Sequence, residues 1–229
     1  MTASEKLWQK VTDRARAKGL DPKIALPVAA AAVTLLGVAQ PLHRVFLTAL
    51  STSEQPAAAV LALLRTLEQA RPYLVGHLEP LLSLLRDTED LEVNLVVGQM
   101  LAQLAEGDLP ALAERPEVAG DVLGPLYTSL TAPADRSAKG AFYTPPALAS
   151  LIAALLDPQA GESCYEPCVG TGGMVIATIR SMRSRGQAPE HTPWVIGDID
   201  RLALAIAGCQ LAAHGMLNVT LTPGDTLVP

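Results

Sequence analysis

Three acidic residues and a run of glycines stand where an α/β protein could bind a nucleotide. Glu166 precedes the run Gly170-Thr171-Gly172-Gly173, which lies between a short apolar segment and a segment with helical periodicity. Glycine lets the backbone pass close to a ligand, and the N–H groups at the start of a helix point toward that ligand. The pattern therefore predicts a strand, a tight turn and a helix, which is how a nucleotide-binding unit begins.

The other two acidic residues follow the next two predicted strands. Asp198 and Asp225 come directly after apolar segments that could pair with the first strand. Because the carboxyl ends of parallel strands meet at one edge, we expect both to face the same edge as Glu166. A carboxylate after the second strand can accept both ribose hydroxyls, and one after the third can reach an adenine amino group. The alternative is that they are ordinary loop carboxylates, since Asp is common in turns; their register behind a glycine turn favours an adenosine-containing ligand.

The elements that must position these residues alternate along the second half of the chain. The pattern predicts helices over 146–156, 174–185 and 201–214, and strands over 162–166, 194–199 and 219–221. Such alternation predicts a parallel sheet with right-handed crossovers. Before this region the chain is rich in alanine and leucine, and its leucine stripes predict the core of a helix bundle. We therefore expect a helical domain over 1–130 and an α/β domain over 131–229.

The composition places limits on the class of protein. The chain has 229 residues, a net charge of -6, 49% hydrophobic residues and 3% aromatic residues. This length suits one large domain or two small ones. The acidic balance argues against a strong nucleic-acid-binding surface on this chain alone.

Cysteine usage and hydropathy predict a cytoplasmic protein without a metal site. Cys164, Cys168 and Cys209 make no disulfide framework, and no second Cys or His pair has zinc-like spacing. The apolar run 24–38 is shorter than the ~20 residues that a membrane span needs, and it contains Pro27. We expect a buried helix there and no membrane partner.

Two adenosine ligands compete for the glycine turn. A dinucleotide site shows the pattern G-x-G-x-x-G, which here would need glycine in place of Val175. That departure disfavours a nicotinamide-dependent oxidoreductase. The form Glu166-Pro167-x-x-Gly170-x-Gly172 instead resembles the S-adenosylmethionine turn of methyltransferases.

The preceding segment resembles a known family. The run from Lys139 to Pro146 is similar to the Gly-x-Phe-Tyr-Thr-Pro segment of the adenine-N6 DNA methyltransferases of the type I restriction–modification kind. The resemblance covers about Asp121 to Leu227. Its further motifs are Gly124-Pro125-Leu126-Tyr127, Leu155-Leu156-Asp157-Pro158, Gly197-Asp198-Ile199-Asp200, Leu211-Ala212-Ala213-His214-Gly215 and Gly224-Asp225-Thr226-Leu227. It implies that residues 131–229 form the S-adenosylmethionine-binding part of a Rossmann-like methyltransferase domain.

The resemblance also implies a role for individual residues. The segment Phe142-Tyr143-Thr144 would fold over the methionine end of the donor, and Glu166 with the four residues Gly170, Thr171, Gly172 and Gly173 would hold the amino-acid part. At the other end, Asp198 would take the ribose hydroxyls, Ile199 would pack on the adenine ring and Asp225 would meet the adenine amino group.

One departure from the family concerns catalysis. The family carries Asn/Asp-Pro-Pro-Tyr/Phe after its fourth strand, where it holds the flipped adenine. No such tetrapeptide occurs in these 229 residues, whose only Pro-Pro is Pro145-Pro146. We therefore identify no catalytic residue and expect the chain alone to be inactive, because methyl transfer needs the target amino group held in line with the donor.

Two hypotheses follow from this departure. In the first, the chain is part of an adenine-specific DNA methyltransferase, completed by further sequence or by a specificity or complementing subunit that brings it to DNA. In the second, it is a non-catalytic, methyltransferase-like protein that binds or regulates a partner.

Overall fold

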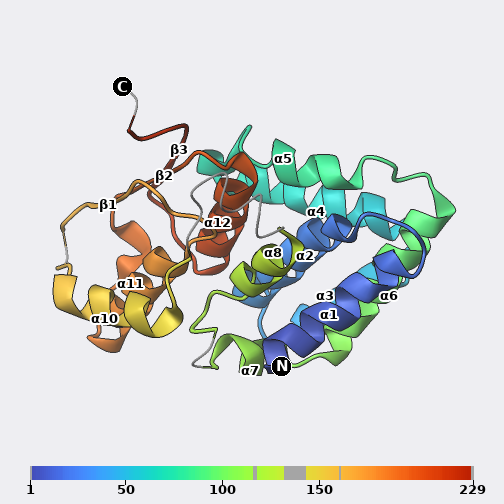
Figure 1. Cartoon of the computed structure of the whole chain (residues 1–229), viewed down its shortest axis with the longest axis horizontal. Helices are drawn as coiled ribbons and strands as arrows, with labels where there is room; N and C mark the ends of the chain where they lie inside the picture. The colour runs from blue at the N-terminus through green and yellow to red at the C-terminus, as the bar shows by residue number, and fades with distance from the viewer. Residues whose placement is uncertain (1, 116–117, 132–142, 160, 228–229) are drawn as a thin grey trace.

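The computed structural model describes residues 2–115, 118–131, 143–159 and 161–227 (Figure 1). The first part of the chain is helical. Its α-helices are α1 (Ala3–Arg16), α2 (Ala25–Val38), α3 (His43–Ser51), α4 (Pro56–Ala70), α5 (Glu79–Leu82), α6 (Leu91–Glu106), α7 (Leu109–Ala113) and α8 (Gly124–Leu130). Side-chain caps define several of their starts; the capping box of Thr2 and Glu5 begins α1, and Asp90 accepts two backbone N–H groups at the start of α6.

The second part contains a small parallel sheet and its helices. Its elements are α10 (Pro146–Leu156), β1 (Cys164–Glu166), α11 (Gly173–Ser184), β2 (Trp194–Asp198), α12 (Arg201–Ala213) and β3 (Val219–Pro223). The strands pair in the order β1-β2-β3, all parallel, with Cys164 opposite Trp194 and Trp194 opposite Val219. The predicted α/β alternation after residue 140 is thus confirmed.

The ends of the elements differ slightly from the predicted ones. β1 begins at Cys164 and not at Glu162, because Glu162 closes a turn in which it exchanges hydrogen bonds with Gln159. β3 continues to Pro223, two residues further than predicted. The extension carries the chain to Gly224, whose N–H donates to the carbonyl of Asp198 at 3.0 Å, so the loop after β3 is held against the end of β2.

Helix α2 lies at the centre of the molecule. All residues from Ala25 to Leu36 are buried, as predicted for the apolar run 24–38, whereas Gly37 and Val38 at its end are exposed. One face packs on α12, which in turn packs on β2 and β3 (Figure 1). Residues of the helical part and of the sheet therefore share one hydrophobic core. Whether residue 130 divides two domains stays a prediction.

The packing of α2 on α12 brings two backbones together. A Cβ atom added to Gly37 would meet the carbonyl oxygen of Ala213 and lie 2.5 Å from its Cα. No side-chain rotation can relieve such a contact, because the obstacle is backbone. Only glycine allows the two helices this approach.

None of the helices that the structure describes is both long enough and apolar enough to cross a lipid bilayer.

We predict that Gly37→Ala destabilises the protein by about 2–3 kcal/mol, because the added Cβ would force the backbones of α2 and α12 apart although Gly37 itself is exposed. The expected measurement is the midpoint of urea unfolding. The matched control is Gly107→Ala, because Gly107 has φ −69° and an added Cβ there meets its nearest atom at 3.4 Å. The control should be neutral or slightly stabilising. Equal midpoints for the two variants would contradict the backbone contact between α2 and α12.

Candidate functional site

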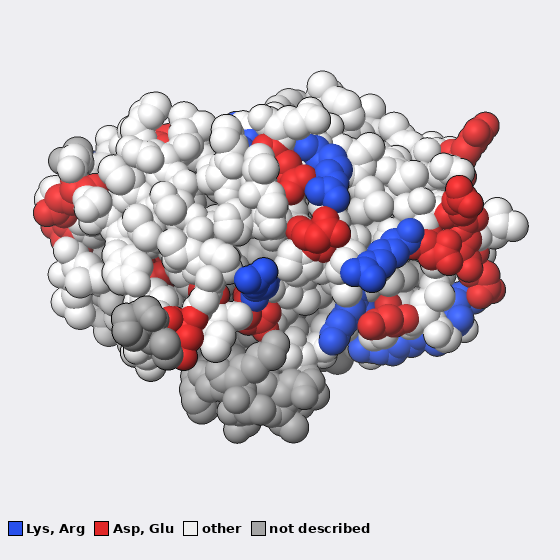
Figure 2. All heavy atoms as spheres, turned by 90° about the horizontal axis from the view of Figure 1, so that it is seen from above, with Lys and Arg blue, Asp and Glu red and all other residues white. Residues whose placement is uncertain are grey.

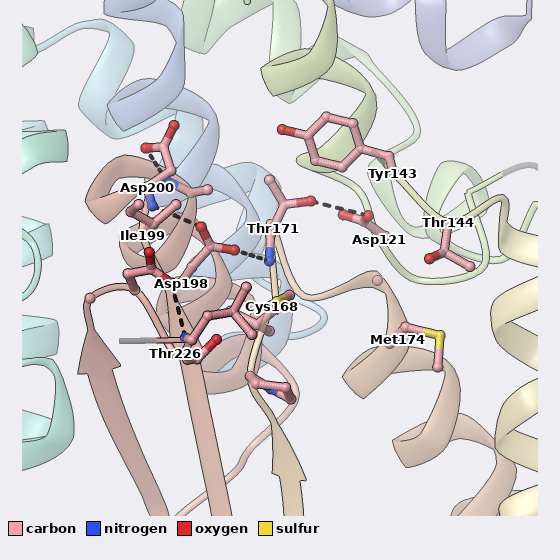
Figure 3. A pocket seen from close by; sticks show the side chains of 18 residues that line it. Asp121, Tyr143, Thr144, Cys168, Thr171, Met174, Asp198, Ile199, Asp200 and Thr226 are labelled. Carbon is pink, nitrogen blue, oxygen red and sulfur yellow. Dashed lines mark hydrogen bonds between the residues drawn. The ribbon is translucent and has the colours of Figure 1, made fainter. Parts of the chain in front are cut away.

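A pocket of about 420 Å³ lies at the carboxyl ends of the three strands (Figure 3). Its walls come from the loops after β1, β2 and β3, together with residues before α10 and before α8. The lining residues are Asp121, Tyr143, Thr144, Pro167, Cys168, Val169, Gly170, Thr171, Gly173, Met174, Asp198, Ile199, Asp200, Ala203, Gly224, Asp225, Thr226 and Leu227.

The pocket brings together most of the residues that the sequence singled out. Those lining it are Tyr143, Thr144, Gly170, Thr171, Gly173, Asp198, Ile199 and Asp225. Gly172 does not line it but forms the N-cap of α11 with φ +104°, a conformation that favours glycine. Phe142 lies outside the described residues.

Glu166 is not among the residues that line the pocket. One of its carboxylate oxygens, Oε1, accepts the backbone N–H of Cys168 at 3.0 Å, which closes the turn after β1. The structure thus places two of the three strand-end acids, Asp198 and Asp225, on the pocket, whereas Glu166 has a local bond within its own turn. Asp225 also has a local bond, since its Oδ1 accepts the N–H of Leu227 at 2.9 Å.

The glycine turn is fixed by its neighbours. The N–H of Val169 donates to the carbonyl of Gly197 on β2 at 2.9 Å, which ties the turn to the sheet. Gly170 has φ +54°, and a Cβ atom there would lie 3.4 Å from the ring of Tyr143. The ring of Tyr143 therefore lies close against the turn.

Asp198 links the turn to the loop after β2. Its Oδ2 accepts the N–H of Gly170 at 2.7 Å, and its Oδ1 accepts the N–H of Asp200 at 2.8 Å. An ionised carboxylate offers about four acceptor positions. Two of them are used by the backbone, so each oxygen of Asp198 can still accept one hydroxyl from a ligand.

Asp200 ties the site to the helical part. Its Oδ1 accepts the N–H groups of Leu202 and Ala203 and so caps α12, while its Oδ2 accepts the hydroxyl of Tyr127 on α8 at 2.7 Å. Burial, followed by the bond to this carboxylate, raises the pKa of Tyr127, so its hydroxyl stays protonated as a donor. The ring of Tyr127 meets Tyr143 edge to face, with centroids 6.2 Å apart.

Asp121 is a pocket residue to which the sequence gave no role. Its Oδ1 accepts the N–H of Gly124 at 2.8 Å and the side-chain amide of Gln210 at 2.7 Å. The same amide donates to the carbonyl of Thr171 at 2.7 Å. Burial raises the pKa of Asp121, although its hydrogen bonds act in the opposite direction. The spacing of Asp121 to Gly124 signals a helix cap in the sequence, but nothing local signals the contact with Gln210.

Within the part of the chain that the structure describes, no group of three or more His, Cys, Asp or Glu side chains is arranged to hold a metal ion.

We predict that Tyr127→Phe destabilises the protein by about 2 kcal/mol, since it removes a buried donor to a carboxylate. Thermal or urea unfolding measures the change. Tyr165→Phe is the matched control, because Tyr165 is 64% exposed, and it should change stability by less than ~0.5 kcal/mol. If Tyr127→Phe proved as stable as the control, the bond between α8 and the start of α12 would contribute nothing measurable.

Over most of its length the chain is similar in fold to a modification subunit of a type I restriction enzyme from Vibrio vulnificus, with a TM-score of 0.55, 14% identity, and coverage of 97% of this chain and 56% of that one. A type I restriction-modification system methyltransferase subunit from Streptococcus thermophilus matches with a TM-score of 0.49 and 16% identity, over 100% of this chain and 60% of that one. The chain thus spans less than two thirds of the length of either protein.

A family model described as N-6 DNA Methylase matches residues 118–228, which include all the residues of the pocket. This confirms the resemblance that the sequence motifs indicated. Residues 118–228 of the chain thus match the N-6 DNA methylase family.

Proposed function

We propose that the pocket binds S-adenosylmethionine, and that the protein serves methyl transfer to the N6 atom of adenine in DNA. The observation that carries this proposal is the meeting of the glycine turn, Asp198 and Asp225 at one pocket. The donor supplies an electrophilic methyl group on a sulfonium sulfur. The residues of this chain bind and orient the donor.

The residues present fit such a donor. The pocket of about 420 Å³ falls within the ~300–1,000 Å³ typical of small-molecule sites. Asp198 keeps acceptor positions for two hydroxyls, and the apolar side chain of Ile199, 59% exposed, is available to cover an aromatic ring. At the other end, the N–H groups that begin α11 favour an anionic group such as the donor's carboxylate.

In the view of Figure 3, Tyr143 and Thr144 lie on the far side of Thr171 from Asp198. In the proposed function they cover the methionine part of the donor, with Phe142 beside them in sequence. Glu166 would act on the amino-acid part only through the turn that it closes.

Partners follow from the same proposal. The face of the molecule in Figure 2 carries mixed charges over the helical part, where basic side chains lie beside acidic ones. Ion pairs within the helical part include Lys18–Glu92 and Arg65–Glu79. That face offers no continuous basic surface for a phosphate backbone. We therefore propose that DNA is engaged in the cytoplasm through additional sequence or through a specificity or complementing subunit.

The second candidate is a non-catalytic, methyltransferase-like protein that binds or regulates a partner. It is favoured by the absence of an Asn/Asp-Pro-Pro-Tyr/Phe tetrapeptide from these 229 residues. The two candidates share donor binding and differ in whether a completed assembly transfers the methyl group.

We predict that the purified protein binds S-adenosylmethionine and S-adenosylhomocysteine, and that Asp198→Ala abolishes the binding heat in calorimetry. The reason is that Asp198 offers the acceptor positions for the ribose. Asp108→Ala is the matched control, because Asp108 also accepts a backbone N–H but does not line the pocket. Preferential binding of NAD would contradict the assignment of the donor.

We predict that the 229-residue chain alone transfers no labelled methyl group to DNA, because nothing identified in it holds the target adenine. Addition of a polypeptide that carries the Asn/Asp-Pro-Pro-Tyr/Phe element should restore transfer, with N6-methyladenine as the product. Label in DNA after incubation with the chain alone would show that another residue holds the base. Persistent inactivity of the complemented assembly would favour the regulatory candidate.

A further inference from the structure

Asp121 comes from a different part of the fold than the other acidic residues of the pocket. Asp198, Asp200 and Asp225 follow strands of the sheet, whereas Asp121 stands just before α8, in the helical part of the chain. In the view of Figure 3, Asp121 and Thr144 lie on one side of Thr171, and Asp198 lies on the other. The pocket therefore has a carboxylate at each end.

The two oxygens of Asp121 are used unequally. Oδ1 accepts two short hydrogen bonds, from the N–H of Gly124 and from the amide of Gln210. Oδ2 accepts from the hydroxyl of Thr171 at 3.4 Å, which is long for a hydrogen bond between oxygens. Oδ2 would also lie 3.2 Å from a Cβ atom added to Gly173, so it stands at the start of α11. Oδ2 keeps acceptor capacity at the pocket wall.

The position of this carboxylate is firmly set. Gln210 is fully buried, and its amide holds both Oδ1 of Asp121 and the carbonyl of Thr171. Its own carbonyl oxygen accepts the N–H of Leu123 at 3.2 Å. Asp121 therefore cannot turn away from the pocket without breaking a buried network.

A cationic ligand would complete the environment of Asp121. Burial disfavours the ionised form of this carboxylate and raises its pKa. Among the residues that the structure describes, no basic side chain lines the pocket with it. An ammonium group from a ligand would supply both a positive charge and hydrogen-bond donors to Oδ2.

We propose that Oδ2 of Asp121 binds the ammonium group of the donor's amino-acid part. This inference rests on the proposed function, because the adenosine end of the donor is assigned to Asp198 and Asp225. With that end fixed, the amino-acid part extends past Thr171 to Asp121. Glu166, which the sequence suggested for the amino-acid part, does not line the pocket.

The test compares two ligands that differ only in the ammonium group, S-adenosylhomocysteine and its des-amino analogue. Their dissociation constants are measured by calorimetry on the full chain. The unaltered protein should bind S-adenosylhomocysteine about 10-fold or more tightly than the analogue, as expected for a charge-assisted hydrogen bond. In Asp121→Asn this ratio should fall to about 1. The amide oxygen takes the place of Oδ1, which accepts two N–H groups, so an NH2 group replaces Oδ2. The negative charge and the acceptor at the Oδ2 position are thus lost while the shape is kept.

The matched control is Asp225→Asn, the same substitution at the opposite end of the pocket. It should weaken both ligands equally and leave their ratio unchanged. Asp121→Ser is the second variant, because a serine hydroxyl can still accept the N–H of Gly124 while the charge is removed. Unfolding midpoints without ligand show whether each variant is folded.

Three results would overturn the proposal: equal affinity of the unaltered protein for the two ligands, an unchanged ratio in Asp121→Asn or Asp121→Ser, or a ratio that collapses in Glu166→Gln. If both Asp121 variants fail to fold, the ratio in the unaltered protein and in Glu166→Gln still decides between the two carboxylates. Failure of the unaltered protein to bind either ligand is a different result, since it rejects the proposed function itself.

Discussion

The close contact between α2 and α12 is the constraint on which the rest of the structure depends. Gly37 brings the backbone of α2 against that of Ala213, and the twelve residues of α2 that precede it are all buried. Helix α12 is in turn the element that covers β2 and β3. The sheet is small, and much of its apolar cover comes from α12, which α2 holds in place. Hydrophobic burial in this layer therefore positions the site as well as stabilising the fold.

Helix α12 also organises the pocket at two points along its length. At its first turn, Asp200 caps the helix and binds Tyr127. Nearly three turns later, Gln210 holds Asp121 and the carbonyl of Thr171. Both links join the helical part to the loops after the strands. The geometry of the glycine turn thus depends on residues that are distant in sequence, as well as on the glycines themselves.

Local patterns predicted the α/β order, the buried helix α2 and the glycine turn, because periodicity, caps and glycines act within a few residues. Asp121 and Gln210 could not be found this way, since their hydrogen bond joins positions 89 residues apart. Glu166 shows the opposite difficulty. It stands at a strand end, as predicted, but its side chain bonds to the nearby N–H of Cys168, and strand-end position alone does not say where a carboxylate points. The start of β1 was misplaced for a similar reason, because the Gln159–Glu162 turn competes with the strand.

The buried position of α2 has a consequence for how the molecule opens. Amide hydrogens exchange with solvent through the local or global opening that exposes them. The amides of α2 and of the adjoining face of α12 belong to one packed layer, so neither set can be exposed while the other keeps its packing. Their exchange rates should converge on a common free energy of opening, even though α2 ends at Val38 and α12 begins only at Arg201. Separation of two elements along the chain is therefore no barrier to their cooperative opening.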